Sequence, residues 1–144
     1  MRRIGITGGI GSGKSVVSRL LRIMGYSVYD TDSEAKRLME SSLEVVQKLS
    51  ECFGRDIYHN GRLNRGLLSS RVFGKSDKIV LLNSIVHPVV RFDFYRWSES
   101  LNEEICFVES AILYESRFDE LVDEVWTVTA PEELRISRVR QRSG

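Results

Sequence analysis

The hydrophobic positions along this chain form two patterns. Some are grouped in short apolar runs, and others recur among polar residues at helical spacing. The apolar runs predict buried strands at residues 3–7, 105–109 and 125–129, and a shorter β-prone run covers residues 26–29. Apolar residues at helical spacing fill most of the chain between these runs. Because strands alternate with helices, the pattern predicts an α/β fold with a mainly parallel sheet flanked by helices.

The expected helices are bounded by capping residues, glycines and prolines. Asn64 and Asp77 are candidate N-caps, Gly25 and Gly54 end helices, and Pro88 is expected to separate two helices. A turn is predicted at residues 59–61. The expected helices cover residues 14–24, 33–39, 43–53, 64–73, 77–87 and 89–101, and a last helix opens at Pro131.

A long helical stretch separates the second and third strands. We expect a single domain over residues 1–144, with a core of about 1–31 and 105–144 and a helical insertion of about 32–104. The insertion is expected to cover the end of the sheet where the loops gather. Because the sequence stops soon after a basic helix and contains only four predicted strands, we expect the natural protein to continue past Gly144.

Composition and charge exclude several classes of protein for this chain. The chain of 144 residues is 42% hydrophobic and 28% charged with a net charge of +1, which excludes a disordered tail, a fibre or a coiled coil. The weak charge gives no reason to expect nucleic acid as a partner. No apolar run spans a membrane, and no signal-peptide core is present, so we expect a cytoplasmic protein, as a monomer or weak homo-oligomer. Cys52 and Cys106 lack the spacing of a zinc site or a disulfide scaffold.

The strongest motif follows the first predicted strand and opens the first predicted helix. It fits G-x-x-x-x-G-K-[ST], the phosphate-binding loop of nucleoside-triphosphate proteins, in the context that the motif requires. Its glycines let backbone N–H groups face phosphate oxygens, while Lys14 reaches the β- and γ-phosphates and the Ser15 hydroxyl binds Mg²⁺. The expected nucleotide-binding residues are Gly8, Gly9, Ile10, Gly11, Ser12, Gly13, Lys14, Ser15 and Val16.

The rest of the sequence favours a kinase over other users of nucleoside triphosphates. The chain has neither the Asn-Lys-x-Asp nor the Asp-x-x-Gly motif of a GTPase. Residues 121–124 only weakly resemble the acidic strand end of a motor ATPase, and a solvated acidic segment explains them as well. The short chain favours a small-molecule kinase.

Several polar residues are candidates for the acceptor side of such a reaction. Asp32 is a candidate base and Asp30 a candidate helper near Mg²⁺, because ligands of parallel sheets bind beyond the carboxyl ends of the strands; either aspartate could instead cap a helix. Glu109 could hold a metal-bound water or cap a turn. Cationic candidates are Arg65 and the pair Arg138 and Arg142, which share a helix face, and His87 is a candidate substrate contact or a buried, turn-capping histidine.

These residues resemble one family, the dephospho-coenzyme A kinases. The resemblance spans essentially the whole chain and starts from Thr-Gly-Gly-Ile-Gly-Ser-Gly-Lys-Ser at residues 7–15. Asp-Thr-Asp at 30–32 resembles the family's Asp-Ala-Asp, and residues 53–65 resemble its Phe-Gly and Gly-x-Leu-x-Arg stretch. Phe73 and the His-Pro pair at 87–88 match further landmarks. The chain departs from the family at residues 111–113 and at Ser143, and the family's chain runs further, supplying the rest of the lid and the last strand.

The resemblance implies a fold, a reaction and a set of roles. The fold is the P-loop kinase type, with a helical substrate-binding insertion and a lid, and the reaction is transfer from ATP to the ribose 3′-hydroxyl of dephospho-CoA. Asp32 would be the base, and Arg65 and His87 would contact the acceptor. Arg142 would be the lid arginine and, with Lys14 and Asp32, a catalytic residue. Mg²⁺ would be held by Ser15, with Asp30 or Glu109 acting through water. Another small-molecule kinase, or a non-catalytic ATP-binding fragment, is the alternative.

Overall fold

The structure, a computed structural model, describes residues 1–143 and, within them, all side chains except those of Arg135, Arg142 and Ser143. The chain forms two compact units. The sheet unit contains Met1–Thr31 and the chain from Phe94 onward, and the helical unit is Asp32–Asp93. The first boundary falls where the insertion was expected to begin, and the second falls within a helix rather than near residue 104.

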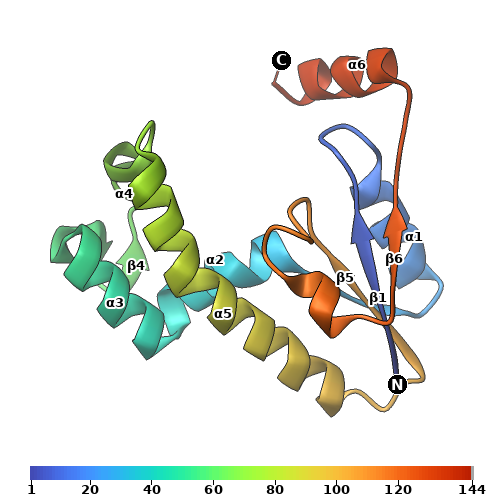
Figure 1. Ribbon diagram of the computed structural model, residues 1–144, viewed down its shortest axis with the longest axis horizontal. Coiled ribbons are helices and arrows are strands. Elements are labelled where there is room, and N and C mark those ends of the chain that lie inside the picture. The colour runs from blue at the N-terminus through green and yellow to red at the C-terminus, as the bar shows by residue number, and fades with distance from the viewer. Residues whose placement is uncertain (144) are drawn as a thin grey trace. The chain divides into compact units, whose positions relative to one another are not determined.

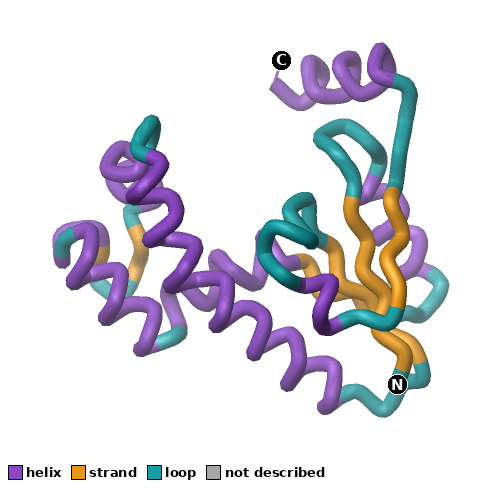
Figure 2. Tube along the Cα trace, viewed as in Figure 1, coloured by secondary structure: helices purple, strands orange, loops and turns teal. Residues whose placement is uncertain are grey.

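A four-stranded, fully parallel sheet forms the centre of the sheet unit, in the order β2-β5-β1-β6. Figure 1 and Figure 2 show these strands side by side. The strands are β1 (Arg2–Thr7), β2 (Ser27–Asp30), β5 (Ile105–Glu109) and β6 (Glu124–Thr127). Their mutual pairing confirms the parallel α/β architecture expected from the apolar runs.

The central strands β1 and β5 are apolar because neighbouring strands and helices cover them. Ile4 and Ile6 of β1, Phe107 of β5 and Leu21 of α1 (Lys14–Ile23) pack into one buried cluster. Burying four such side chains makes this cluster a principal source of the unit's stability. It also fixes the two ends of the loop between β1 and α1.

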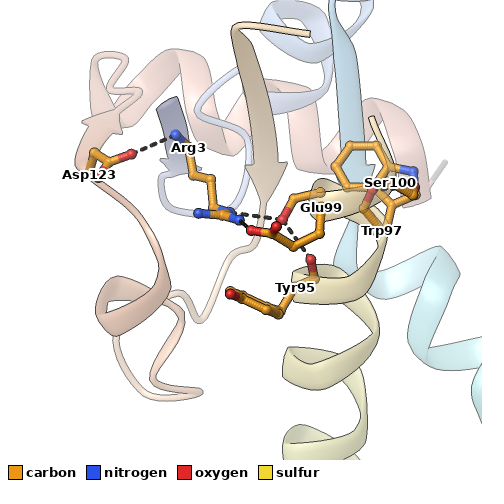
Figure 3. A network of polar contacts seen from close by, with 7 residues as sticks. Arg3, Tyr95, Trp97, Glu99, Ser100 and Asp123 are labelled. Carbon is orange, nitrogen blue, oxygen red and sulfur yellow. Dashed lines mark hydrogen bonds and ion pairs between the residues drawn. The ribbon is translucent and has the colours of Figure 1, made fainter. Parts of the chain in front are cut away.

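Arg3 links the first strand to the C-terminal end of α5 (Ser76–Ser100), as Figure 3 shows. Its Nε donates a 2.8 Å hydrogen bond to Ser98 Oγ, its guanidinium pairs with Glu99, and it lies 5.0 Å from the centre of the Tyr95 ring. The backbone N–H of Arg3 donates to Asp123 Oδ2 at 2.8 Å. The C-terminal end of α5 is therefore fixed to the sheet near the amino ends of the strands.

Pro88 lies inside α5 and does not end it, so the prediction of two helices separated at this proline is wrong. The missing N–H of a proline leaves one helical hydrogen bond unmade. Buried side chains continue on one face of the helix through the proline, at Ile85, Val86, Val90 and Phe94. Burial of this continuous face outweighs the lost bond, and the proline's ring lies on the exposed side.

The helical unit is built from short elements around its own apolar core. Its elements are α2 (Thr31–Ser41), α3 (Leu43–Phe53), η1 (Arg55–Ile57), β3 (Tyr58–His59), β4 (Arg62–Leu63), α4 (Arg65–Val72) and the first part of α5. The turn predicted at residues 59–61 joins β3 and β4 as an antiparallel hairpin. Asn64 caps α4 as expected, since its Oδ1 accepts the Leu67 N–H at 3.0 Å.

Two further elements complete the sheet unit. The chain after β5 passes through η2 (Phe118–Leu121) into β6, and α6 (Glu132–Ser143) follows β6, beginning one residue after Pro131. Among the described residues, no helix combines the length and apolar character needed to cross a bilayer.

Candidate active site

The loop between β1 and α1 has the conformation of an anion-binding cradle. Gly11 and Gly13 have φ values of 72° and 104°, in the left-handed region that favours glycine. Gly13 is the N-cap of α1 and provides no side-chain acceptor for the helix's first N–H groups. Because no side chain caps this helix start, its first N–H groups and the positive end of the helix dipole can bind phosphate oxygens, although the Val16 N–H already donates to the Gly13 carbonyl at 3.1 Å.

Gly8 and Ser12 show how tightly the loop is folded. A Cβ atom at Gly8 would lie 2.6 Å from Ser12 Oγ and in still closer contact with the Val128 carbonyl oxygen. Ser12 Oγ is buried and has no hydrogen-bond partner among the described residues. A buried hydroxyl without a partner is costly, and together with the glycine cradle it fits a loop that is completed by a polyphosphate ligand.

Two carboxylates lie beside the loop at the carboxyl edge of the sheet. Asp30 and Glu109 occupy paired positions at the ends of β2 and β5. Burial raises the pKa of Glu109, the negative charge of Asp30 raises it further, and the nearby Ser18 hydroxyl and Lys14 ammonium oppose this rise. The three groups Lys14, Asp30 and Glu109 therefore share one electrostatic environment.

A magnesium ion would find oxygen donors here, although no group of three or more His, Cys, Asp or Glu side chains that could hold a metal occurs among the described residues. Mg²⁺ in such sites keeps several waters and is held by few protein ligands together with substrate phosphates. The Ser15 hydroxyl at the start of α1 and the carboxylates of Asp30 and Glu109 match this sparse donor set.

Helix α6 places an arginine on the loop. Arg138 Nη1 donates a 3.1 Å hydrogen bond to the Gly11 carbonyl oxygen, and the same nitrogen lies 3.2 Å from where a Cβ at Gly13 would be. The predicted lid arginine, Arg142, has its side chain outside the described part of the structure. The sequence offered Arg138 as the partner of Arg142 on the same helix face, and the structure shows that Arg138 contacts the loop at Gly11.

The helical unit contains its own pocket, of about 390 Å³. Three charged side chains stand at this pocket: Asp32 and Lys36 from α2, and Arg65 from the start of α4. The remaining lining is mainly apolar and consists of Ala35, Met39, Leu63, Leu68, Ser69, Val72 and Leu82. A carboxylate and two cations over an apolar floor suit an acceptor that carries a hydroxyl, phosphate groups and an extended organic part.

Asp32 and Arg65, both chosen from the sequence, thus line the same pocket, whereas His87 is not among the described residues lining it. His87 is half-buried in α5, where burial and the positive charge of Arg91 lower its pKa. Lys36 was not singled out from the sequence. The signal that identifies it is its spacing of four residues from Asp32, which puts both side chains on one face of a helix.

Comparison with known proteins gives consistent results. A family model described as dephospho-CoA kinase matches residues 2–144. A dephospho-CoA kinase from Porphyromonas gingivalis is 47% identical over 144 residues, covering 100% of this chain and 71% of that protein. A crystal structure of a Thermus thermophilus protein aligns with a TM-score of 0.82 at 37% identity, over 99% of this chain and 73% of the other.

A more distant solved structure supports the fold alone. A dephospho-CoA kinase from Campylobacter jejuni aligns with a TM-score of 0.62 at 17% identity, covering 99% of this chain and 96% of that one. The chain thus has the fold of that protein over nearly its whole length.

Proposed function

This chain belongs to the dephospho-CoA kinase family, and we propose that it transfers the γ-phosphoryl group of ATP to the ribose 3′-hydroxyl of dephospho-CoA, giving CoA and ADP. The observation that carries the proposal is the complete phosphate-binding loop between β1 and α1, with its positive-φ glycines and uncapped helix start. The acceptor pocket of the helical unit adds the carboxylate and cations that the second substrate requires.

The sheet unit would bind ATP. Backbone N–H groups within residues 8–16 would donate to the phosphates, and Lys14 would neutralise charge on the β- and γ-phosphates. Arg138 would exchange its bond to the Gly11 carbonyl for a phosphate oxygen, because a guanidinium binds an anionic oxygen more strongly than a neutral carbonyl. Arg142 is proposed to assist from the same helix.

The Ser15 hydroxyl at the start of α1 would hold Mg²⁺, whose positive charge would reduce the negative charge that opposes transfer. Asp30 and Glu109 would hold its waters from the ends of β2 and β5. Glu109 is partly buried near Lys14, and the Lys14 charge opposes the rise in the pKa of Glu109 that burial causes.

The helical unit would bind the acceptor. Asp32, in the first turn of α2, would accept the proton of the 3′-hydroxyl as the oxygen attacks the γ-phosphorus, and the bond from that phosphorus to the bridging oxygen of ADP would break. Arg65 and Lys36 would bind the acceptor's phosphate groups. His87 would contact the substrate outside this pocket lining, where burial and the charge of Arg91 lower its pKa and so favour its neutral form.

The test is ADP release from MgATP with and without dephospho-CoA. We expect acceptor-dependent turnover that falls by about 100-fold or more in Lys14→Ala, since removal of one group that stabilises transition-state charge costs this much. Asp32→Asn should lose turnover while ATP binding persists. Lys75→Ala and Asp119→Asn serve as matched controls and should keep turnover, because they alter exposed residues of the same types that belong neither to the loop nor to the pocket lining.

Each alternative gives a different result. Turnover with a nucleoside monophosphate or shikimate in place of dephospho-CoA would replace the proposed acceptor. Binding of ATP without turnover of any acceptor would identify a non-catalytic nucleotide-binding chain.

A further inference from the structure

Three charged residues follow one another along one face of α2, at intervals of four residues: Asp32, Lys36 and Glu40. Asp32 and Lys36 line the pocket of the helical unit, and Glu40 is not among its described lining residues. A half-buried acid just behind a substrate pocket, and on the same helix face as the pocket's own charges, calls for an explanation.

Glu40 contacts the segment that carries Arg65. Its Oε1 accepts a hydrogen bond from the backbone N–H of Leu63 at 3.3 Å. The same oxygen lies 3.7 Å from Arg65 Nη2. One carboxylate oxygen therefore holds both the end of β4 and the guanidinium that stands at the pocket.

A second bond holds the same two segments together. The Tyr58 hydroxyl in β3 donates to the Met39 carbonyl oxygen at 2.6 Å. Burial and the negative charge of Glu40 raise the pKa of Tyr58 to about 12, so this donor stays protonated at physiological pH. The last turn of α2 is thus tied to both strands of the hairpin, at Tyr58 in β3 and at Leu63 in β4.

The energetics favour a positioning role over a stabilising one. The side chains of Arg65 and Glu40 are 45% and 32% exposed, and ion pairs of this exposure contribute little to folding. Restricting the long, flexible Arg65 side chain affects ligand binding more than folding stability. The conformational entropy of this side chain is already lost when the chain folds, so it is not lost again when a ligand binds. The guanidinium has further N–H groups available for an anion.

We propose that Glu40 is a positioning residue that fixes the Arg65 guanidinium at the acceptor pocket, ready to bind the phosphate groups of the acceptor. The inference deepens the proposed function and rests on it, because the pocket's ligand is taken to be dephospho-CoA. Glu40 itself does not touch substrate.

The experiment is a double-mutant cycle read out by calorimetric binding of dephospho-CoA to the full chain. Glu40→Gln keeps an oxygen that can accept the Leu63 N–H and removes the charge that holds Arg65, so we expect affinity to fall about five- to tenfold. In the Arg65→Ala background the same change should have no further effect, since Glu40 then has nothing to position. Glu44→Gln on the exposed face of α3 is the matched control.

Steady-state kinetics provide a second readout, which would not change if Glu40 had only a structural role. Glu40→Gln should raise the KM for dephospho-CoA and leave kcat and the KM for ATP unchanged. Glu40→Asp, which keeps the charge on a shorter side chain, should restore part of the affinity.

Specific results would overturn the inference. These are unchanged affinity in Glu40→Gln, or the same loss with and without Arg65, which would show that Glu40 only stabilises the unit. If Glu40→Gln fails to fold, equal affinity of Glu40→Asp and the unaltered chain would overturn it as well. An unaltered chain that does not bind dephospho-CoA would overturn the proposed function and this inference with it, whereas binding that is indifferent to Glu40 overturns the inference alone.

Discussion

At the level of single residues, the phosphate-binding loop depends on places where a side chain cannot fit. Gly8 lies against the Val128 carbonyl and the Ser12 hydroxyl, and Gly11 and Gly13 adopt positive φ. The loop's chemistry is thus backbone chemistry, and Lys14 adds the one long cation that the motif specifies.

Gly8→Ala is expected to distort the loop and weaken ATP binding more than tenfold, because the new Cβ would meet backbone as well as the Ser12 side chain. Gly66→Ala is the matched control, since a Cβ there makes only an ordinary 3.6 Å contact with Asn64 Oδ1. The measurement is the rise in Tm on adding MgATP, which should shrink in the first variant and persist in the second. An undiminished rise in Gly8→Ala would contradict the prediction.

Glu109 is expected to make stability depend on pH. Its pKa is raised in the folded chain, mainly by burial, so the folded state holds the proton more tightly than the unfolded state does. This contribution is present below the ordinary glutamate pKa and is lost as pH rises through the higher, folded value. Thermal melts between mildly acidic and neutral pH should show a downward slope that Glu109→Gln reduces; an identical slope in the variant would exclude Glu109 as its source.

At the level of elements, the helical unit is held by a clamp between α3, η1 and α4. Arg71 of α4 donates to both carboxylate oxygens of Asp56, at 2.7 and 2.6 Å, and to the Phe53 carbonyl at 2.5 Å. The last bond satisfies a carbonyl at the end of α3, where the helix dipole favours a cation. Gly54, with φ of 105°, leaves the room that the guanidinium occupies.

Arg71→Ala should lower the Tm at neutral pH, whereas Arg55→Ala, on the exposed side of η1, should not. The hydrogen bonds from Arg71 lower the pKa of Asp56, so the clamp's contribution is present above the ordinary aspartate pKa and is lost as pH falls through the lower, folded value. The difference in Tm between Arg71→Ala and the unaltered chain should therefore shrink in strong acid. A difference that is constant with pH would show that the Asp56 charge is not involved.

At the level of the whole molecule, the two substrates are assigned to two compact units. The phosphate-binding loop belongs entirely to the sheet unit, and the pocket with Asp32, Lys36 and Arg65 belongs entirely to the helical unit. Phosphoryl transfer requires both substrates at once. Each substrate bound alone should nevertheless affect only the unit that binds it.

Hydrogen exchange tests this division. MgATP should slow exchange of the amides of residues 8–16, and dephospho-CoA should slow exchange in α2, the β3–β4 hairpin and the start of α4. ADP with dephospho-CoA should protect both sets. Dephospho-CoA that protects only the loop of the sheet unit would contradict the assignment of the acceptor pocket.

Local sequence signals predicted most of the elements and the glycine-rich loop between β1 and α1. Periodicity and capping predicted the four strands and α3 closely, because apolar alternation and residues such as Asn64 and Gly54 act over a few positions. They failed at Pro88, where a buried face that continues across the proline outweighs its local preference. The hairpin strands were missed because two-residue strands carry no periodicity.

What the sequence by itself determined is the nucleotide end of the reaction. Residues 8–15 specify an anion cradle through glycine conformations and a helix start, and these are properties of consecutive residues. Only the tertiary structure decided the partners: Arg138 at Gly11, Glu109 beside Asp30, and Glu40 behind Arg65. Each pair joins residues far apart in the chain, and their contact depends on how strands and helices pack, which no local pattern encodes.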